Sequence, residues 1–256
     1  MPPLRYFVPN AFTALSLLLG LASISMSAQG DFRLAAWMIL WGVLLDKLDG
    51  TAARLMKATS KFGVEFDSFA DFVVFGIAPA ALVYYRLLAT GHIVGWHKSG
   101  IMAASGIYAL ALAVRLSRFN ITTGGESIFF GLPGTLLGAA IASGYLVWEK
   151  HGLPESMLRY VPAFLVVAAV LMVSNVRLPK IKLRKSKAFN VFLGANLVFG
   201  YICGPLMLFP EYLLACAVTY TVGGVIYCLL NPEQSPASDD VSAESADDDA
   251  AQERLA

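Results

Sequence analysis

Four aspartates between positions 46 and 71 are the side chains in this sequence best suited to chemistry: Asp46, Asp49, Asp67 and Asp71. Long apolar runs flank them, at residues 34–45 and 72–88. A carboxylate within or at the edge of a membrane helix costs about 2.5–3.5 kcal/mol unless its charge is offset. Four carboxylates together therefore require a strong positive partner, and a bound cation can supply it.

The spacing of the aspartates predicts two acidic helix faces. Asp46 and Asp49 are three positions apart, and Asp67 and Asp71 are four apart, so each pair lies on one side of a helix. A short polar segment, residues 57–61, joins the two stretches. We therefore expect antiparallel neighbouring helices whose carboxylates meet. Converging oxygen ligands suit Mg²⁺, Mn²⁺ or Ca²⁺ better than a soft metal.

Small residues and one arginine accompany the acids. Gly50, Ala53 and Gly63 add no side-chain bulk, so a phosphate or a neighbouring backbone can come close. Arg54 follows Ala53 and can bind phosphate oxygens through paired N–H donors. Carboxylates, divalent cations, an arginine and small residues are the components of a phosphoryl-transfer site.

Two other interpretations of the acids are open. They could be unrelated surface acids on a soluble amphipathic hairpin, but the flanking runs are typical of a membrane protein. They could also form the proton or ion path of an ion-coupled transporter. Transporters are typically built from inverted repeats with helices broken at mid-membrane, and no internal repeat is visible here.

The pattern D-x-x-D-G-x-x-A-R-x8-G-x3-D-x3-D resembles the motif of the CDP-alcohol phosphotransferase family at every defined position: Asp46, Asp49, Gly50, Ala53, Arg54, Gly63, Asp67 and Asp71. The resemblance implies that the four aspartates hold two divalent cations, Mg²⁺ or Mn²⁺, against the diphosphate of a CDP-linked lipid. It implies that Asp49, Gly50, Ala53, Arg54 and Gly63 contact the CDP group. It also implies that Asp71 is the general base, a role that spacing alone does not establish.

The first apolar run adds two candidates for the nucleotide site. Its opening, P-N-A-F-T-A-L-S at residues 9–16, resembles the first core helix of the same family, in which polar side chains face the nucleotide. Asn10 and Thr13 are therefore candidate CDP-binding residues. The alternatives are that Asn10 caps the helix and that Thr13 packs between helices.

Four further segments are similar to family members that use CDP-diacylglycerol and L-serine and release CMP: residues 67–80, 115–120, 131–134 and 171–174. In R-L-S-R-F-N, Arg115 and Arg118 are candidates to bind the serine carboxylate through paired N–H donors. Asn120 is a candidate for the amino group or the carboxylate. The arginines could instead anchor the helix at the interface or contact the CDP phosphates. Glycerol 3-phosphate, inositol phosphate and choline are the alternative acceptors, and a phosphorylated acceptor would need a denser cationic pocket.

Composition describes the framework that must position these residues. Hydrophobic residues make up 57% of the 256, and charged residues only 14%, against about a quarter in ordinary globular chains. The net charge of +1 gives no reason to expect nucleic-acid binding. We predict an all-α polytopic membrane bundle at residues 1–230 and an acidic, disordered tail at 231–256. About eight membrane spans are expected, at residues 11–27, 34–56, 63–88, 100–119, 134–148, 158–176, 188–209 and 212–230.

The basic residues predict the orientation. With the N-terminus inside, one side carries the aspartates and most of the cationic residues: Arg5, Arg54, Lys57, Lys61, Arg115, Arg118 and the block 177–187. The other side carries fewer: Arg33, Arg86, Lys98, Lys150 and Arg159. The positive-inside rule then places the aspartates at the cytoplasmic face of the inner membrane, in contact with membrane lipids. The family resemblance also implies a homodimer.

Overall fold

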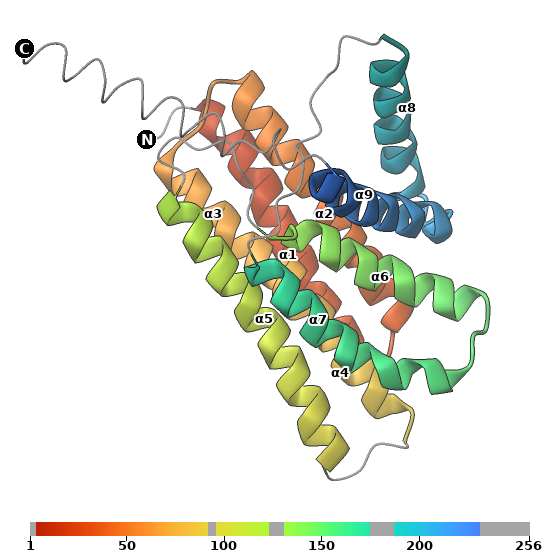
Figure 1. Cartoon of the computed structure of the whole chain (residues 1–256). Coiled ribbons are helices and arrows are strands. Elements are labelled where there is room, and N and C mark those ends of the chain that lie inside the picture. Colours follow the sequence, from red (N-terminus) through yellow and green to blue (C-terminus); the bar gives the residue numbers. More distant parts are fainter. Residues whose placement is uncertain (1–3, 92–95, 123–130, 175–186, 231–256) are drawn as a thin grey trace, which may run out of the picture.

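The computed structural model describes residues 4–91, 96–122, 131–174 and 187–230, and within them the chain is helical throughout, without a strand (Figure 1). The predicted acidic tail and the basic block 177–186 lie outside the described residues. The elements are η1 (Leu4–Tyr6), α1 (Phe7–Gln29), α2 (Phe32–Leu55), α3 (Lys61–Asp71), η2 (Phe72–Ile77), α4 (Ala78–Ala89), α5 (Trp96–Thr122), α6 (Gly134–Lys150), η3 (Glu155–Tyr160), α7 (Val161–Val173), α8 (Lys187–Cys203) and α9 (Pro210–Leu230).

Small and hydroxyl-bearing residues bring α1 and α2 together as a hairpin. The buried stripe of α1 includes Ser16, Gly20 and Ser23. Ser16 donates to the carbonyl of Gly42 at 3.3 Å, and Ser23 donates to the carbonyl of Ala35 at 2.9 Å. Small side chains allow two backbones to approach closely, and hydroxyls can hydrogen-bond across the interface. This hairpin sets the position of the acidic end of α2.

The predicted helix at 63–88 is continuous, but its middle is a π-helix. α3 ends at Asp71, η2 covers Phe72–Ile77, and α4 continues from Ala78. π-helical turns inside α-helices are rare and are frequent at functional sites. In η2 the fully buried Val74 projects toward α1 and α2, where a Cβ built on Gly20 would lie 2.9 Å from Val74 Cγ2. Packing at η2 therefore fixes α3 against the hairpin.

The start of α1 differs from the prediction. The expectation that Asn10 is an N-cap is wrong, because α1 already begins at Phe7 after a turn of 3-10 helix. Pro9 does not delay the start, since a proline fits the first turn of a helix, where backbone N–H groups lack intrahelical partners. Asn10 is thus a helical residue whose side chain is free to face a neighbouring element.

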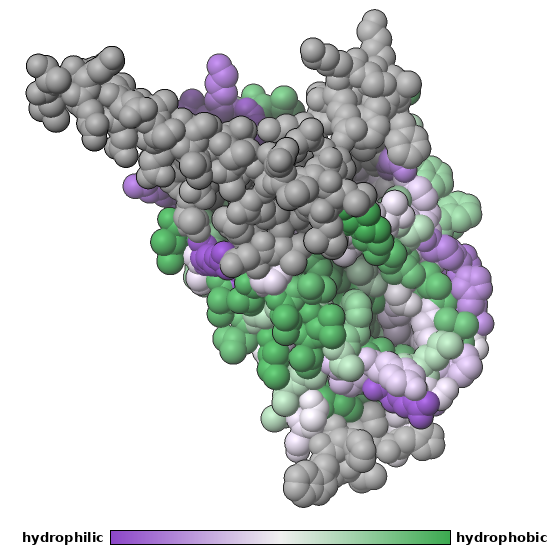
Figure 2. Space-filling view, in the orientation of Figure 1, coloured by the Kyte–Doolittle hydropathy of each residue, from purple (hydrophilic) through white to green (hydrophobic). Residues whose placement is uncertain are grey.

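Four helices in the described part of the chain are long and apolar enough to cross a membrane: Phe7–Gln29, Lys61–Ala89, Lys98–Ile121 and Glu155–Val173. The outward faces of α5 and α7 are apolar, with Leu110 63% and Val170 64% exposed, and apolar side chains gather on this face of the molecule (Figure 2). The chain is an integral membrane protein. The count of eight spans stays a prediction, since acidic and basic residues interrupt the apolar run of α2 and α6 has only 17 residues.

Gly42 tests the packing of η2 against the hairpin. A Cβ on Gly42 would overlap Val74 Cγ1. We expect Gly42→Ala to lower the free energy of unfolding by about 1–3 kcal/mol, because overpacking forces a backbone shift. The midpoint of thermal unfolding in detergent measures the effect. The double variant Gly42→Ala/Val74→Ala should recover part of the loss, because it removes the two methyl groups of Val74.

Gly106→Ala is the matched control, since no atom of the described residues lies within 4 Å of the Cβ that it adds to α5. Equal midpoints for Gly42→Ala and Gly106→Ala would contradict the packing described here.

Candidate functional site

The four aspartates come together where α2 and α3 meet. One carboxylate oxygen from each of Asp46, Asp49 and Asp67 can be chosen so that all lie within 4.8 Å of one another, an arrangement that could hold a metal ion. The Asp71 side chain lies within hydrogen-bonding reach of Asp46. The two predicted acidic helix faces therefore do face each other.

Nearby basic side chains offset little of this negative charge. Lys47 Nζ lies 3.8 Å from Asp46 Oδ2, but the lysine side chain is 60% exposed, so water screens the attraction. Arg115 on α5 lies near Asp71. Among the described residues, the four clustered carboxylates, of which Asp49 is buried, therefore outnumber the basic side chains close to them. A set of carboxylate oxygens with excess negative charge fits a hard divalent cation.

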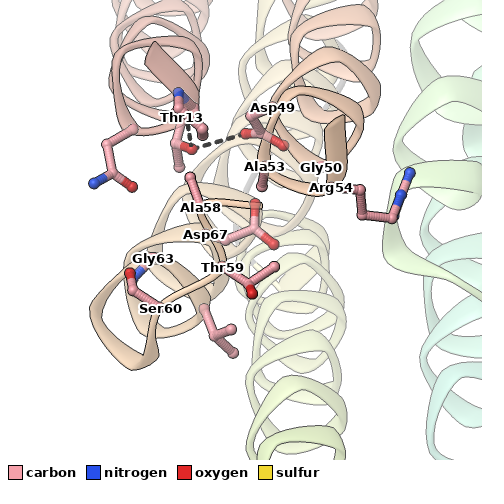
Figure 3. Close-up of a pocket in the computed structure, with 13 residues that line it drawn as sticks. Thr13, Asp49, Gly50, Ala53, Arg54, Ala58, Thr59, Ser60, Gly63 and Asp67 are labelled. Atoms are coloured by element: carbon pink, nitrogen blue, oxygen red, sulfur yellow. Dashed lines mark hydrogen bonds between the residues drawn. The ribbon is translucent and has the colours of Figure 1, made fainter. Parts of the chain in front are cut away.

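A cavity of about 180 Å³ opens beside the aspartates, between α1, α2 and the start of α3 (Figure 3). Its wall includes every residue predicted to contact CDP: Asn10, Thr13, Asp49, Gly50, Ala53, Arg54 and Gly63. Asp67 and the turn Ala58–Ser60 complete much of the remaining wall. The motif thus borders a space that can admit a polar group next to the carboxylates.

Thr13 holds one of the acids in place. Its hydroxyl donates to Asp49 Oδ2 at 2.8 Å, and its oxygen also lies 3.2 Å from the carbonyl oxygen of Pro9 (Figure 3). Both Thr13 and Asp49 are buried. The hydroxyl of Thr13 therefore orients the carboxylate of Asp49, in addition to bordering the cavity.

The two motif glycines have different surroundings. A Cβ on Gly63 would lie 3.2 Å from Ser60 Oγ and 3.4 Å from Asn10 Oδ1, so Gly63 allows α3 to begin close to α1. Ser60 caps this helix by accepting from the Gly63 N–H at 3.0 Å. At Gly50, by contrast, the nearest neighbour of an added Cβ would be Arg54 Nη1 at 3.8 Å. Gly50 therefore leaves the backbone of α2 open to the cavity.

Arg54 borders the cavity, but its side chain extends away from Asp49 and Asp67 (Figure 3). Its Nη2 donates a long hydrogen bond of 3.5 Å to Thr51 Oγ1. Arg54 is exposed, so rotation of its flexible side chain can redirect the guanidinium. Contact with a bound phosphate would require that rotation.

The three residues predicted to bind serine separate into two groups. Arg115 lies near Asp71, and its buried Nε has no hydrogen-bond partner among the described residues. Asn120 lies against α3, where Nδ2 donates to Ser68 Oγ at 3.0 Å. Arg118 instead donates from Nη1 to the carbonyl of Val173, at the end of α7, at 3.3 Å. The structure brings Arg115 and Asn120 to the site and turns part of Arg118 toward α7.

Glu65 is a neighbour of this site that the sequence analysis did not single out. Its Oε2 accepts from Asn120 Nδ2 at 3.3 Å. The signal was present in the sequence, since Glu65, Ser68 and Asp71 recur every three residues and so lie along one stripe of α3. Glu65 was not singled out because it is not a defined position of the motif, which includes Asp67 and Asp71, four positions apart.

Known proteins resemble this chain over most of its length. A family model described as CDP-alcohol phosphatidyltransferase matches residues 6–223. A curated CDP-diacylglycerol–serine O-phosphatidyltransferase of Helicobacter pylori is 35% identical over 221 residues, covering 77% of this chain and 90% of the relative. An archaetidylserine synthase of Methanothermobacter thermautotrophicus is 31% identical over 176 residues, covering 68% and 70% respectively. The CDP-diacylglycerol–serine O-phosphatidyltransferase of Bacillus subtilis is 35% identical over 135 residues, covering 53% and 73%.

From the hydrogen bond between Thr13 and Asp49 we predict that loss of the Thr13 hydroxyl weakens metal binding. Mn²⁺ should raise the midpoint of thermal unfolding, because a ligand that binds the folded state stabilises it. In Thr13→Val, which removes the hydroxyl at similar volume, the half-saturating Mn²⁺ concentration should rise about 10- to 100-fold, as is typical when a group that orients a ligand is lost.

Thr221→Val is the control, because Thr221 donates to the carbonyl of Ala217 within α9 and takes no part in the acidic cluster. An unchanged Mn²⁺ titration for Thr13→Val would mean that Asp49 needs no such orientation, or binds no metal.

Proposed function

Because the chain belongs to the CDP-alcohol phosphatidyltransferase family, we propose that it transfers the phosphatidyl group of CDP-diacylglycerol to the hydroxyl of L-serine and releases CMP. One observation carries the proposal: the aspartates of the motif lie together beside a cavity. The other motif residues, Gly50, Ala53, Arg54 and Gly63, border that cavity. The relatives named as serine phosphatidyltransferases support the choice of donor and acceptor.

The four aspartates are proposed to hold two divalent cations, Mg²⁺ or Mn²⁺. When bound, such cations would neutralise the donor diphosphate and the charge that develops on the departing CMP. The excess of carboxylates over nearby basic groups supports this occupancy. Thr13 keeps the carboxylate of Asp49 directed toward the cluster by donating its hydroxyl.

The cavity between α1, α2 and α3 is the proposed nucleotide site. Gly50 and Ala53 let the cytidine end approach the backbone of α2, and Gly63 keeps the start of α3 close to Asn10. Arg54, at the rim, would rotate inward to bind phosphate oxygens in a bidentate manner. The acyl chains of the donor would stay in the bilayer, against the apolar outer faces of the helices.

Asp71 is proposed to remove the proton from the serine hydroxyl. As the oxygen of serine bonds to the phosphorus of the phosphatidyl group, the bond from that phosphorus to CMP breaks, and the proton passes to the Asp71 carboxylate. Two observations support this role: the Asp71 side chain lies within hydrogen-bonding reach of Asp46, and Arg115 lies near Asp71. A hydroxyl held there would be close to both base and phosphate.

Arg115 is the proposed partner of the serine carboxylate. Its buried Nε has no acceptor in the part of the chain that the structure describes, so a ligand carboxylate would supply a hydrogen bond to this donor. Asn120, on the same helix, is the proposed second residue that contacts serine, through the amino group or the carboxylate of serine. Arg118 has a smaller role in this proposal, because its guanidinium bonds the end of α7.

The proposal also includes the orientation of the protein in the membrane and its oligomeric state. The distribution of basic residues supports a site at the cytoplasmic face of the inner membrane. There the site would bind the CDP headgroup of the lipid at the membrane surface. A homodimer is proposed from the family resemblance, with membrane lipids around it.

A panel of acceptors tests the proposed reaction. Purified protein with CDP-diacylglycerol and Mn²⁺ or Mg²⁺ should release CMP when L-serine is added, and not with glycerol 3-phosphate, inositol phosphate or choline. CMP release is measured by chromatography, with a chelator as the metal-free control. CMP release only with glycerol 3-phosphate would show that this compound, and not serine, is the acceptor. No CMP release with any of the acceptors would favour a transporter.

Asp71→Asn tests the base. The change keeps the volume of the side chain but removes its ability to accept the proton, so kcat should fall at least about 100-fold. The affinity for CDP-diacylglycerol should stay within about threefold of that of the parent protein. It is measured from the rise in the midpoint of thermal unfolding as the lipid is added.

Asp31→Asn is the matched control, because Asp31 caps the distant start of α2 and asparagine caps helices equally well. Near-normal turnover in Asp71→Asn would exclude Asp71 as the base.

A further inference from the structure

A small polar network joins α3 to α5 beside the proposed base. Asn120 Nδ2 donates to Ser68 Oγ at 3.0 Å and to Glu65 Oε2 at 3.3 Å. The Ser68 hydroxyl has two acceptors within reach, the carbonyl of Val64 at 3.1 Å and Asn120 Oδ1 at 3.3 Å. Glu65 is exposed, and the ion pairs found among the described residues involve other carboxylates. The network thus ends in a negative charge without a basic partner in the described part of the chain.

The contacts fix how α3 and α5 lie relative to each other. Asn120 meets Glu65 and Ser68, whereas Arg115, five residues earlier, lies near Asp71, so the two helices are antiparallel. Five residues of helix span about 7.5 Å. Along this seam Arg115 and the proposed base therefore lie near each other. Ser68, Asn120 and Glu65 lie about 4.5–9 Å closer to the start of α3.

The arrangement is complementary to an amino acid. Serine carries a hydroxyl, a carboxylate and an ammonium group on adjacent carbons. With the hydroxyl at Asp71 and the carboxylate at Arg115, the ammonium group points along the seam toward Ser68, one turn or about 4.5 Å along α3 from Asp71. There it would meet the oxygens of Ser68 and Asn120.

We infer that Glu65, Ser68 and Asn120 form the subsite for the ammonium group of the acceptor, with Glu65 as a positioning residue. The inference rests on the proposed function and names the chemistry by which that site selects an amino acid. A carboxylate can only accept, so Glu65 holds the NH₂ side of the Asn120 amide and fixes the direction of Oδ1. That oxygen lies 3.3 Å from Ser68 Oγ and has a second lone pair, which can accept from the ammonium group. Its negative charge also stabilises the cation one hydrogen bond away.

Glu65→Gln, with two fragments of serine as competitors, tests the inference. Ethanolamine keeps the hydroxyl and ammonium groups, and 3-hydroxypropionate keeps the hydroxyl and carboxylate. In Glu65→Gln the KM for serine and the inhibition constant of ethanolamine should each rise about tenfold. The inhibition constant of 3-hydroxypropionate and kcat should change by less than about threefold.

Two variants complete the experiment. Glu65→Asp retains the charge and should recover part of the lost affinity for serine. Glu149→Gln removes an exposed glutamate of α6 that hydrogen-bonds to Tyr145, away from this seam, and should leave all constants unchanged.

Equal changes in both inhibition constants would show general damage to the site, and no change in either would show that Glu65 is not involved; each result overturns the inference. A parent protein that does not use serine would instead overturn the proposed function, so the two failures are distinguishable.

Discussion

The mutual repulsion of four carboxylates is the constraint on which the rest of this structure depends. Asp46, Asp49 and Asp67 present oxygens within 4.8 Å of one another, and Asp71 lies within hydrogen-bonding reach of Asp46. Such a cluster is unfavourable in a membrane protein unless cations occupy it. The same property makes the cluster useful, since ions held by it can grip a diphosphate.

Several neighbouring elements serve to hold this cluster in shape. Hydroxyls of α1 bond the backbone and a carboxylate of α2, so the acidic end of α2 is fixed from one side. The π-helical turn after Asp71 inserts Val74 between α1 and α2, which fixes α3 from the other side. The cavity lies between these supports. Rigid surroundings of this kind are what a site needs if charged groups are to stay near each other without relaxing apart.

Much of the site could be predicted from sequence because helical spacing translates directly into shared faces. Two pairs of aspartates on helices joined by a short turn must meet, and the structure brings them together. The small residues of the motif likewise border the cavity. The start of α1 could not be placed from Asn10, since capping residues also occur inside helices. The π-helical turn has no clear sequence signature, because it follows from the packing of Val74 against glycines distant in sequence.

The directions of the side chains around the acidic cluster could not be predicted from the spacing of residues along the sequence. Arg115 and Arg118 are one turn apart on α5, yet one faces the acidic cluster and the other bonds the end of α7. The difference depends on where α7 ends, which the order of residues in α5 does not encode. Glu65 was overlooked for a related reason, because its importance appears only when α5 is seen beside α3.

The most direct measurement of the central claim is anomalous diffraction at the manganese edge, from crystals grown with Mn²⁺ and CDP-diacylglycerol. The account predicts two peaks between α2 and α3, enclosed by Asp46, Asp49, Asp67 and Asp71, next to the lipid diphosphate. Crystals that contain the lipid but show no manganese among these carboxylates would contradict it.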